Sequence, residues 1–251
     1  MELSGSTALV TGAASGLGAA TARALAGRGV DVVGLDLAAP ADSGDPRIRY
    51  VTADVTDELQ VAAALAQLPD TAPLRLVVNC AGIAPAMRLL SSNGVVHDLA
   101  SFRRAVDVNL VGTFNVLRLA AEVMAGNTPL DDDGQRGLIV NTASIAAYDG
   151  QMGQVAYAAS KGAIVGMTLP AARDLARNGI RVNTIAPGIV ATPLLTGLGE
   201  KVVDGLAATV PFPARLARPD EYAQLVLMLA DHDYLNGETI RMDGALRMAP
   251  Q

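Results

Sequence analysis

Hydrophobic residues occur along the chain in short continuous runs, and these runs alternate with longer segments of helical composition. The runs have the character of buried strands and cover residues 7–11, 31–36, 48–51, 74–79, 137–142, 180–186 and 238–242. The helical segments are residues 16–28, 57–68, 99–124 and 154–177. Apolar strands that alternate with helices are typical of a parallel sheet covered on both faces. The pattern predicts a doubly wound α/β sheet of about seven strands.

Some segments depart from this alternation. Residues 85–98 lose periodicity and predict a loop or insertion, and the Asp- and Gly-rich residues 127–136 predict a solvent loop. Pro170 lies well inside a helical segment and predicts a kink or a local break. Residues 192–219 are rich in glycine and proline and follow the carboxyl end of a strand, so we expect them to cover a substrate. No linker or internal repeat divides residues 1–251, which we expect to form one domain.

Composition adds limits on partners and location. Hydrophobic residues make up 51% of the chain and aromatic residues 3%, so aliphatic side chains must build the core. The net charge of -6 and the pI of about 4.9 argue against a nucleic-acid partner, because binders of phosphate backbones concentrate basic charge. Charged residues interrupt each apolar stretch before the roughly 18 residues that a membrane span needs, so we expect no membrane partner.

Cysteine occurs once, as Cys80, which excludes an intrachain disulfide and favours a reducing compartment. The first residues, Met1 to Gly5, have no basic region followed by a long apolar run. We therefore expect a soluble, cytoplasmic protein. No Cys, His and carboxylate residues have metal-ligand spacing, and we expect no metal requirement.

A glycine-rich turn separates the first strand from the first helix. It reads Thr11-Gly12-Ala13-Ala14-Ser15-Gly16-Leu17-Gly18. Glycines let a backbone turn sharply and approach a pyrophosphate, whose charge is met by the amides and the positive dipole end of the following helix. In this strand–turn–helix context the turn predicts a dinucleotide site. Its contacts are expected at Gly12, Ser15, Gly16, Leu17 and Gly18.

Asp36 ends the second strand, where a carboxylate can accept hydrogen bonds from the ribose hydroxyls of adenosine and repel a 2′-phosphate. No arginine or lysine lies in the glycine turn or in residues 37–40. Arg47 and Arg49 are the nearest basic residues downstream, and they lie at the start of the third predicted strand. The sequence therefore predicts NAD rather than NADP. The alternative for Asp36 is an ordinary turn residue at the end of a strand.

Two further groups of candidate cofactor contacts follow the third and fourth strands. Ligands of open α/β sheets bind at the carboxyl ends of the strands, so the recurrence of such groups at these ends carries more weight than either group alone. Their members are Asp54, Val55, Asn79, Cys80, Ala81 and Gly82.

The helical segment 154–177 carries Tyr157 and Lys161, which are four residues apart and thus lie on the same face. A phenol normally ionises near pH 10. A fixed cation beside it favours the phenolate, so we expect Lys161 to lower the pKa of Tyr157 and make it a usable base. The alternative is a surface lysine near a half-buried tyrosine.

The glycine turn, Asn79-Cys80-Ala81-Gly82, Ser144 and the pair Tyr157 and Lys161 together resemble the short-chain dehydrogenase/reductase family. Asn109 matches the family's helix asparagine and Pro187-Gly188 its turn after the sixth strand. The resemblance spans essentially the whole chain. It implies a seven-stranded Rossmann-type fold, with a nucleotide half of about residues 1–140 and a catalytic half of about 141–251. It also implies a homotetramer in which two long helices pair between subunits.

The resemblance implies a role for each candidate. Tyr157 would take the proton of a secondary alcohol while hydride passes to the nicotinamide, and Lys161 would also hold the nicotinamide ribose. Ser144 would hydrogen-bond the substrate oxygen, and Asn109 would hold a water in a proton relay to Lys161. The alternatives are a turn cap for Ser144 and a buried, backbone-paired asparagine for Asn109.

Further contacts follow from the resemblance. Pro187, Val190 and Thr192 should touch the nicotinamide end, and Gln151 the substrate. Segments between Ile145 and Pro250, with residues 85–98 as an insertion, resemble a subgroup that acts on (3S)-3-hydroxyacyl-CoA. That subgroup implies conversion to 3-oxoacyl-CoA. The alternatives are a 3-oxoacyl carrier-protein reductase, a hydroxysteroid dehydrogenase, or an NAD-binding scaffold without turnover. Candidates for the CoA phosphates, each alternatively a surface arginine, are Arg88, Arg103, Arg215 and Arg218.

Overall fold

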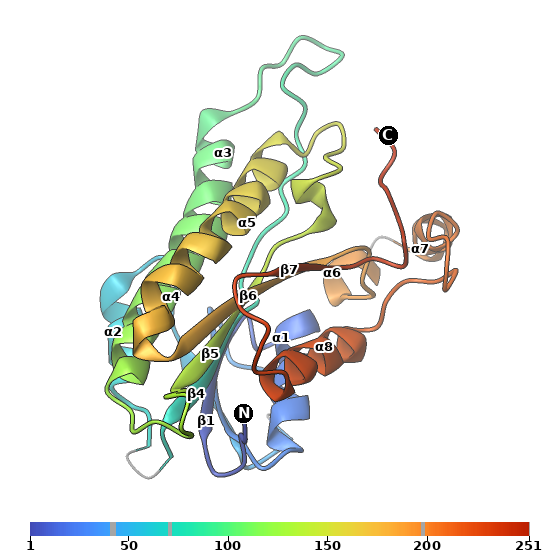
Figure 1. Cartoon of the computed structure of the whole chain (residues 1–251). Coiled ribbons are helices and arrows are strands. Elements are labelled where there is room, and N and C mark those ends of the chain that lie inside the picture. The colour runs from blue at the N-terminus through green and yellow to red at the C-terminus, as the bar shows by residue number, and fades with distance from the viewer. Residues whose placement is uncertain (41–43, 70–71, 197–198, 251) are drawn as a thin grey trace.

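A computed structural model describes residues 1–40, 44–69, 72–196 and 199–250. Its centre is a seven-stranded sheet, parallel throughout, with the strand order β3-β2-β1-β4-β5-β6-β7 (Figure 1). The predicted doubly wound sheet is confirmed. The strands are β1 (Thr7–Thr11), β2 (Asp31–Asp36), β3 (Ile48–Thr52), β4 (Leu74–Asn79), β5 (Gly137–Thr142), β6 (Ile180–Pro187) and β7 (Thr239–Met242).

Helices cover both faces of the sheet. α1 and α8 pack on one face, where Leu25 and Tyr222 are fully buried, and α2, α4 and α5 pack on the other. The strand order reverses between β1 and β4, which creates the crevice where open α/β sheets bind ligands. The helices are α1 (Gly16–Ala26), α2 (Glu58–Leu65), α3 (Leu99–Val106), α4 (Gly112–Ala125), α5 (Val155–Leu175), α6 (Pro193–Thr196), α7 (Glu200–Ala207) and α8 (Pro219–Asp231).

The long helix expected over residues 99–124 is present, but it contains a π-helical turn at Asp107–Val111 between α3 and α4. Within the described part of the chain, the stretch Leu99–Ala125 is the one helix long and apolar enough to cross a membrane, and 50% of its most apolar window is buried. Val116, Ala120 and Met124 lie in the core against the sheet. Packing on the sheet accounts for the apolar character of this helix.

Two helical features differ from expectation. α5 is one unbroken helix although Pro170 lies inside it. Pro170 leaves the carbonyl of Gly166 without a helical donor, but both residues are exposed, so water can hydrogen-bond that carbonyl. α8 was not expected from the sequence, although Pro219 at its first position and the acidic Asp220 and Glu221 in its first turn are a recognisable start signal.

The loop predicted over residues 85–98 is confirmed, and the covering role expected of residues 192–219 stays a prediction. Residues 85–98 contain no helix and a single bridge, between Leu90 and Val96. The expected cover over residues 192–219 contains the short helices α6 and α7. Gly197, which contributed to the expectation of a cover, lies outside the described residues.

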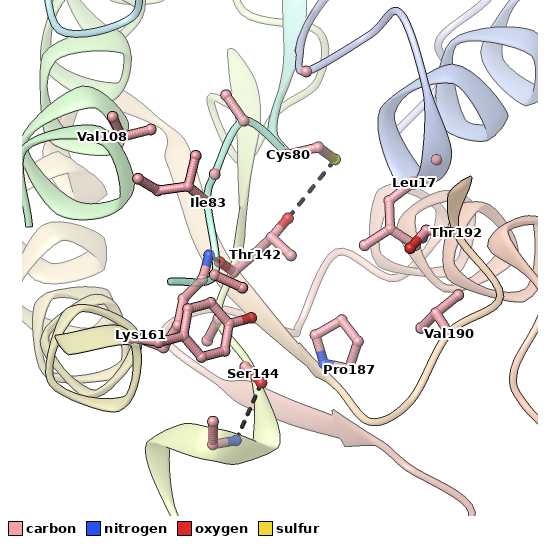
Figure 2. A pocket seen from close by; sticks show the side chains of 18 of the residues that line it. Leu17, Cys80, Ile83, Val108, Thr142, Ser144, Lys161, Pro187, Val190 and Thr192 are labelled. Carbon is pink, nitrogen blue, oxygen red and sulfur yellow. Dashed lines mark hydrogen bonds between the residues drawn. The ribbon is translucent and has the colours of Figure 1, made fainter. Parts of the chain in front are cut away.

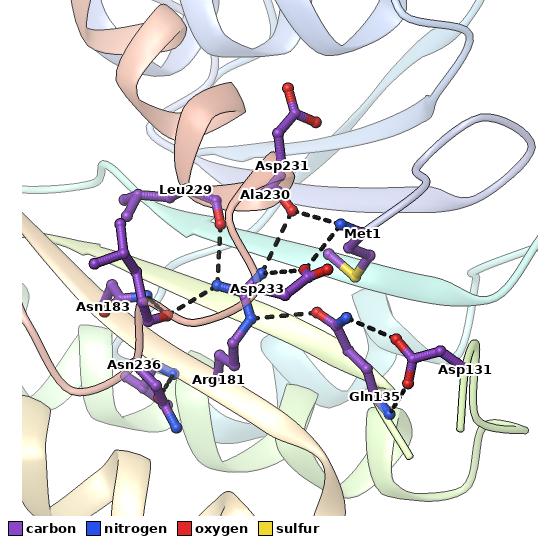
Figure 3. A network of polar contacts seen from close by, with 12 residues as sticks. Met1, Asp131, Gln135, Arg181, Asn183, Leu229, Ala230, Asp231, Asp233 and Asn236 are labelled. Atoms are coloured by element: carbon purple, nitrogen blue, oxygen red, sulfur yellow. Dashed lines mark hydrogen bonds and ion pairs between the residues drawn. The ribbon is translucent and has the colours of Figure 1, made fainter. Parts of the chain in front are cut away.

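Arg181 on β6 is a buried charge that joins the sheet to the end of α8 (Figure 3). Its guanidinium donates to the carbonyls of Leu229 and Leu235, both at 3.0 Å, and to Gln135 Oε1 at 3.2 Å. Asp233 lies 3.5 Å away and supplies the opposite charge. Burial lowers the pKa of Arg181, and Asp233 partly offsets this effect. The side chain therefore links the sheet to the end of α8 through buried hydrogen bonds.

We expect Arg181→Ala to lower the free energy of unfolding by about 3 kcal/mol, because it leaves several buried carbonyls without donors. Arg177→Ala, which removes an exposed arginine next to the same strand, should change it by less than about 0.5 kcal/mol. The measurement is urea unfolding followed by circular dichroism. Equal midpoints for the two variants would contradict the structural role of Arg181.

Candidate active site

A cleft with a volume of about 1380 Å³ runs along the carboxyl ends of the strands. It is lined by nearly all of the side chains and turns that the sequence singled out, so the fold brings both halves of the predicted site together (Figure 2). The predicted residues that line it are Gly12, Ser15, Gly16, Leu17, Gly18, Asp36, Asp54, Val55, Cys80, Ala81, Gly82, Ser144, Gln151, Tyr157, Lys161, Pro187, Val190 and Thr192. Asn79 and Asn109 do not line it.

The glycine turn has the shape that a pyrophosphate site requires. Gly12 and Gly16 have positive φ angles of 63° and 53°. A Cβ on Gly12 would lie 2.9 Å from the amide nitrogen of Ala81, and a Cβ on Gly18 would collide with the carbonyl of Gly12. The first turn of α1 has no acidic residue, and Ser15 makes no side-chain cap bond. The amides at this helix start are thus available to an anion, and the turn fits a dinucleotide.

Asp36 joins the end of β2 to the glycine turn. Its Oδ2 accepts a hydrogen bond from the amide of Ala14 at 2.9 Å, and its Oδ1 accepts one from Leu37 at 2.8 Å. A carboxylate oxygen can accept two hydrogen bonds, so each oxygen keeps capacity for a hydroxyl in the cleft. The carboxylate therefore shapes the turn and also faces the ligand space.

Lys161 and Tyr157 lie on the same face of α5, as predicted. The Lys161 ammonium lies 5.9 Å from the centre of the Tyr157 ring and donates a hydrogen bond to the carbonyl of Thr142 at 2.7 Å. Figure 2 shows Lys161 and Ser144 on the side of the cavity away from Leu17 and Thr192. Lys161 is buried, and burial lowers its pKa from 10.5 to about 8.

The expected lowering of the Tyr157 pKa is wrong for the protein by itself. Burial of the phenol raises its pKa, and hydrogen bonding to Ser144 opposes this rise without overcoming it. The reason is that desolvation disfavours the phenolate, while the ammonium of Lys161 is directed at the carbonyl of Thr142. The sequence placed the cation correctly, but it carried no information on the cost of burial.

Ser144 is buried directly after β5, and its Oγ accepts a hydrogen bond from the amide of Ala146 at 3.1 Å. It therefore caps the 3₁₀ turn Ile145–Ala147, which was the structural alternative for this residue. An accepted bond uses a lone pair, so the hydroxyl proton can still be donated on the side of Tyr157, with which Ser144 also hydrogen-bonds. The cap fixes where that proton can point, and Ser144 can serve as a cap and as a site residue together.

Asn109 is fully buried in the π-helical turn. Its amide donates to the carbonyl of Ile83 and to Ser160 Oγ, both at 2.9 Å, and its oxygen accepts from the amide of Ile83 at 2.8 Å. Both side-chain donors are used within the protein, so the structural alternative describes real contacts, and the relay role of Asn109 stays a prediction. A Cβ on Gly82 would lie 3.0 Å from Asn109 Oδ1, so the asparagine packs under the Gly82–Ile83 backbone.

Asn79 also differs from its expected role as a cofactor contact. It is buried at the end of β4 and donates to Asn141 Oδ1 on the neighbouring strand at 2.9 Å. The alternation of side chains along β4 explains this difference, because Asn79 lies on the same sheet face as Val77 in the core. It ties two strand ends together beneath the site.

The structure adds contacts that the motifs did not indicate. The carbonyl of Thr142 holds Lys161, while the Thr142 hydroxyl lies 2.7 Å from Tyr222 Oη on α8. Leu246 and Arg247, from the far end of the chain, line the cleft. Local sequence contains no signal for a main-chain acceptor or for contacts made by a distant segment. Among the residues described, no three or more His, Cys, Asp or Glu residues gather as a metal site.

Known proteins resemble this chain in sequence over nearly its whole length. A family model described as enoyl-(acyl carrier protein) reductase matches residues 12–246. The 3-hydroxyacyl-CoA dehydrogenase type-2 of Homo sapiens is 53% identical over 258 residues, covering 99% of this chain and 98% of that protein. The protein of the same name from Drosophila melanogaster is also 53% identical, covering 96% and 97%.

A solved structure has the same fold. The crystal structure of 3-hydroxyacyl-CoA dehydrogenase type-2 from Mycobacterium avium has a TM-score of 0.93 and 43% identity, and 98% of each chain is covered. The matched family model, these relatives and the shared fold extend over nearly the whole chain. The chain belongs to the short-chain dehydrogenase/reductase family.

Proposed function

We propose that this protein is an NAD-dependent dehydrogenase that interconverts (3S)-3-hydroxyacyl-CoA and 3-oxoacyl-CoA. The observation that carries the proposal is the convergence of Ser144, Tyr157 and Lys161 in one cleft with the glycine turn. Relatives with more than half of their residues identical bear the name 3-hydroxyacyl-CoA dehydrogenase type-2, which supports the substrate class. The family implies a nicotinamide cofactor, and Asp36 supports NAD.

The chemistry divides between the cofactor and the protein. When bound, the nicotinamide cofactor supplies the hydride acceptor for alcohol oxidation. Ser144 donates a hydrogen bond to the substrate oxygen and sets its distance from Tyr157, which accepts the hydroxyl proton. The ammonium of Lys161, 5.9 Å from the centre of the Tyr157 ring, offsets part of the cost that burial adds to the phenolate, and the hydrogen bond to the Thr142 carbonyl keeps this cation within the site.

Asn109 has a positioning role in this proposal. Its hydrogen bonds to Ile83 and Ser160 link the turn after β4 to α5, between the expected cofactor contacts and Lys161. A relay water bound by its side-chain amide is not part of the proposal, because both amide protons have protein partners.

We also propose that the protein is a cytoplasmic homotetramer. Apolar side chains on the long helices support the assembly, since Val111, Phe114 and Leu169 are 43%, 49% and 44% exposed in the single chain. Pairing of α4 and α5 between subunits would cover them. The lack of a second cysteine supports a reducing compartment.

The substrate proposal predicts that the purified protein oxidises NADH when acetoacetyl-CoA is added. The steady-state rate, followed at the NADH absorbance, should exceed the rate with NADPH at equal concentration. Turnover of a 3-oxoacyl carrier protein or a steroid ketone without turnover of 3-oxoacyl-CoA substrates would favour the alternatives. Absence of turnover with all three, despite NADH binding, would favour a scaffold.

The cofactor proposal predicts that Asp36→Ala raises the KM for NADH about tenfold and narrows the preference for NADH over NADPH, because it removes a ribose acceptor and a negative charge. The readout is the ratio of the kcat/KM value for NADH to that for NADPH. Loss of the hydrogen bond from Ala14 would disturb the glycine turn for both cofactors and would therefore leave this ratio unchanged. Asp31→Ala, at the other end of β2, is the control. An unchanged ratio in Asp36→Ala would contradict the role of Asp36.

The mechanism predicts that Tyr157→Phe lowers kcat at least about 100-fold, because it removes the proton acceptor. NADH affinity, measured by fluorescence titration, should stay within about threefold, since the ring and Lys161 remain. Tyr234→Phe changes a side chain that is 97% exposed and is the matched control. A Tyr157→Phe enzyme with the wild-type rate would overturn the assignment.

A further inference from the structure

The segment 243–250 forms one wall of the cleft at its substrate end. Leu246, Arg247, Met248 and Ala249 all line the cleft. The segment is attached next to the proposed substrate contact, because Gln151 Nε2 donates to the carbonyl of Ala249 at 3.1 Å. The amide of Met152 also donates to the carbonyl of Pro250 at 3.0 Å.

The wall segment is held firmly at its base. Leu246 is buried against Ile145 and Val210. Arg241 on β7 donates to the carbonyl of Leu246 at 3.0 Å and pairs with Asp149 at 2.6 Å and Asp243 at 2.7 Å. This network fixes the backbone that leads into Arg247. A side chain on a fixed backbone loses less conformational entropy when it binds a ligand than a side chain on a mobile loop.

A second observation is the backbone of Ala245, which has a φ of 66°. A residue with a Cβ is strained in this left-handed region, and such strain persists only where the surroundings enforce it. Here Asp243 Oδ1 accepts a hydrogen bond from the Ala245 amide at 3.0 Å. The turn directs the chain from β7 back over the cleft and places Arg247 at its edge.

Arg247 has capacity for a further anionic partner. Its side chain is 62% exposed, and its Nη1 is used on Asp243 at 3.1 Å and on the Leu246 carbonyl at 2.8 Å. Nε and Nη2 have no hydrogen-bond partner among the described residues. Asp243 is shared with Arg241, so its charge is only partly available to Arg247. The free edge of the guanidinium suits a phosphate.

Other cations are less suited to this end of the cleft. Arg215 and Arg218 both pair with Glu221, at 2.7 and 3.3 Å, and this pairing holds the pKa of Glu221 at about 2. Arg88 does not line the cleft, and Lys161 is buried with its ammonium on the Thr142 carbonyl.

Arg103 and Arg104 also line the cleft, but from α3. Figure 1 shows α3 and the wall segment on opposite sides of the first half of α5. These two arginines are thus separated from the substrate end where Gln151 and the wall segment meet.

From this arrangement we propose that Arg247 binds the phosphate groups of the CoA moiety when the thioester enters the cleft. The inference rests on the proposed function, because it names which part of that substrate the segment 243–250 recognises. Arg247 is a substrate-binding residue in this proposal and takes no part in proton or hydride transfer.

The test compares three thioesters with an identical acyl group: acetoacetyl-CoA, acetoacetyl-dephospho-CoA and the phosphate-free S-acetoacetyl-N-acetylcysteamine. In Arg247→Glu we expect the KM for acetoacetyl-CoA to rise about tenfold or more, because repulsion replaces a charge-assisted hydrogen bond. The kcat, and the kcat/KM for the phosphate-free thioester, should stay within about twofold. Arg247→Lys should recover part of the affinity, since it keeps the charge. Arg177→Glu, which makes the same charge change far from the cleft, is the control.

The dephospho thioester distinguishes the two phosphate sources. If its KM is unaffected by Arg247→Glu, Arg247 contacts the ribose 3′-phosphate; if its KM rises as well, Arg247 contacts the pyrophosphate. Both results support the proposal. An equal loss of kcat/KM with the phosphate-free thioester would show a structural role for Arg247 and overturn the proposal, as would an unchanged KM for acetoacetyl-CoA. A wild-type protein inactive toward all three thioesters would refute the proposed function instead.

Discussion

The hydrogen bond from Lys161 to the carbonyl of Thr142 is the contact on which the rest of the site depends. It joins the first half of α5 to the last residue of β5. It also places a buried cation near the Tyr157 ring. A buried ammonium is costly without a partner, as the lowered pKa of Lys161 shows. The carbonyl reduces this cost and at the same time fixes the direction of the charge.

Thr142 extends this contact to the other face of the sheet. Its hydroxyl meets the fully buried Tyr222 of α8 at 2.7 Å, and the thiol of Cys80 lies 3.7 Å from both oxygens. Burial raises the pKa of the Cys80 thiol, so it stays protonated as a packing group. One residue at a strand end therefore connects α5, α8 and the turn after β4, which are the elements that surround the proposed cofactor and substrate.

Several site residues also hold the fold. Asp36 ties the glycine turn to β2, Ser144 caps the turn after β5, and Asn109 fastens the backbone of Ile83. The structural alternatives considered for Ser144 and Asn109 thus describe real contacts. For Ser144 and Asp36 the structural contact leaves hydrogen-bonding capacity free toward the cleft, whereas the donors of Asn109 are all used. A site built in this way is arranged before its ligands arrive.

The sequence by itself determined the parallel sheet, the strand positions and most of the site residues that it singled out in the cleft, because strand periodicity, glycine turns and the i, i+4 spacing of Tyr157 and Lys161 are local properties. It also contained the start signal of α8 at Pro219. The tertiary structure alone decided three features: the raised pKa of Tyr157, the inward direction of Asn79 and the return of Arg247 to the cleft. Each depends on burial or on contacts between segments far apart in the chain, and no local pattern encodes those quantities.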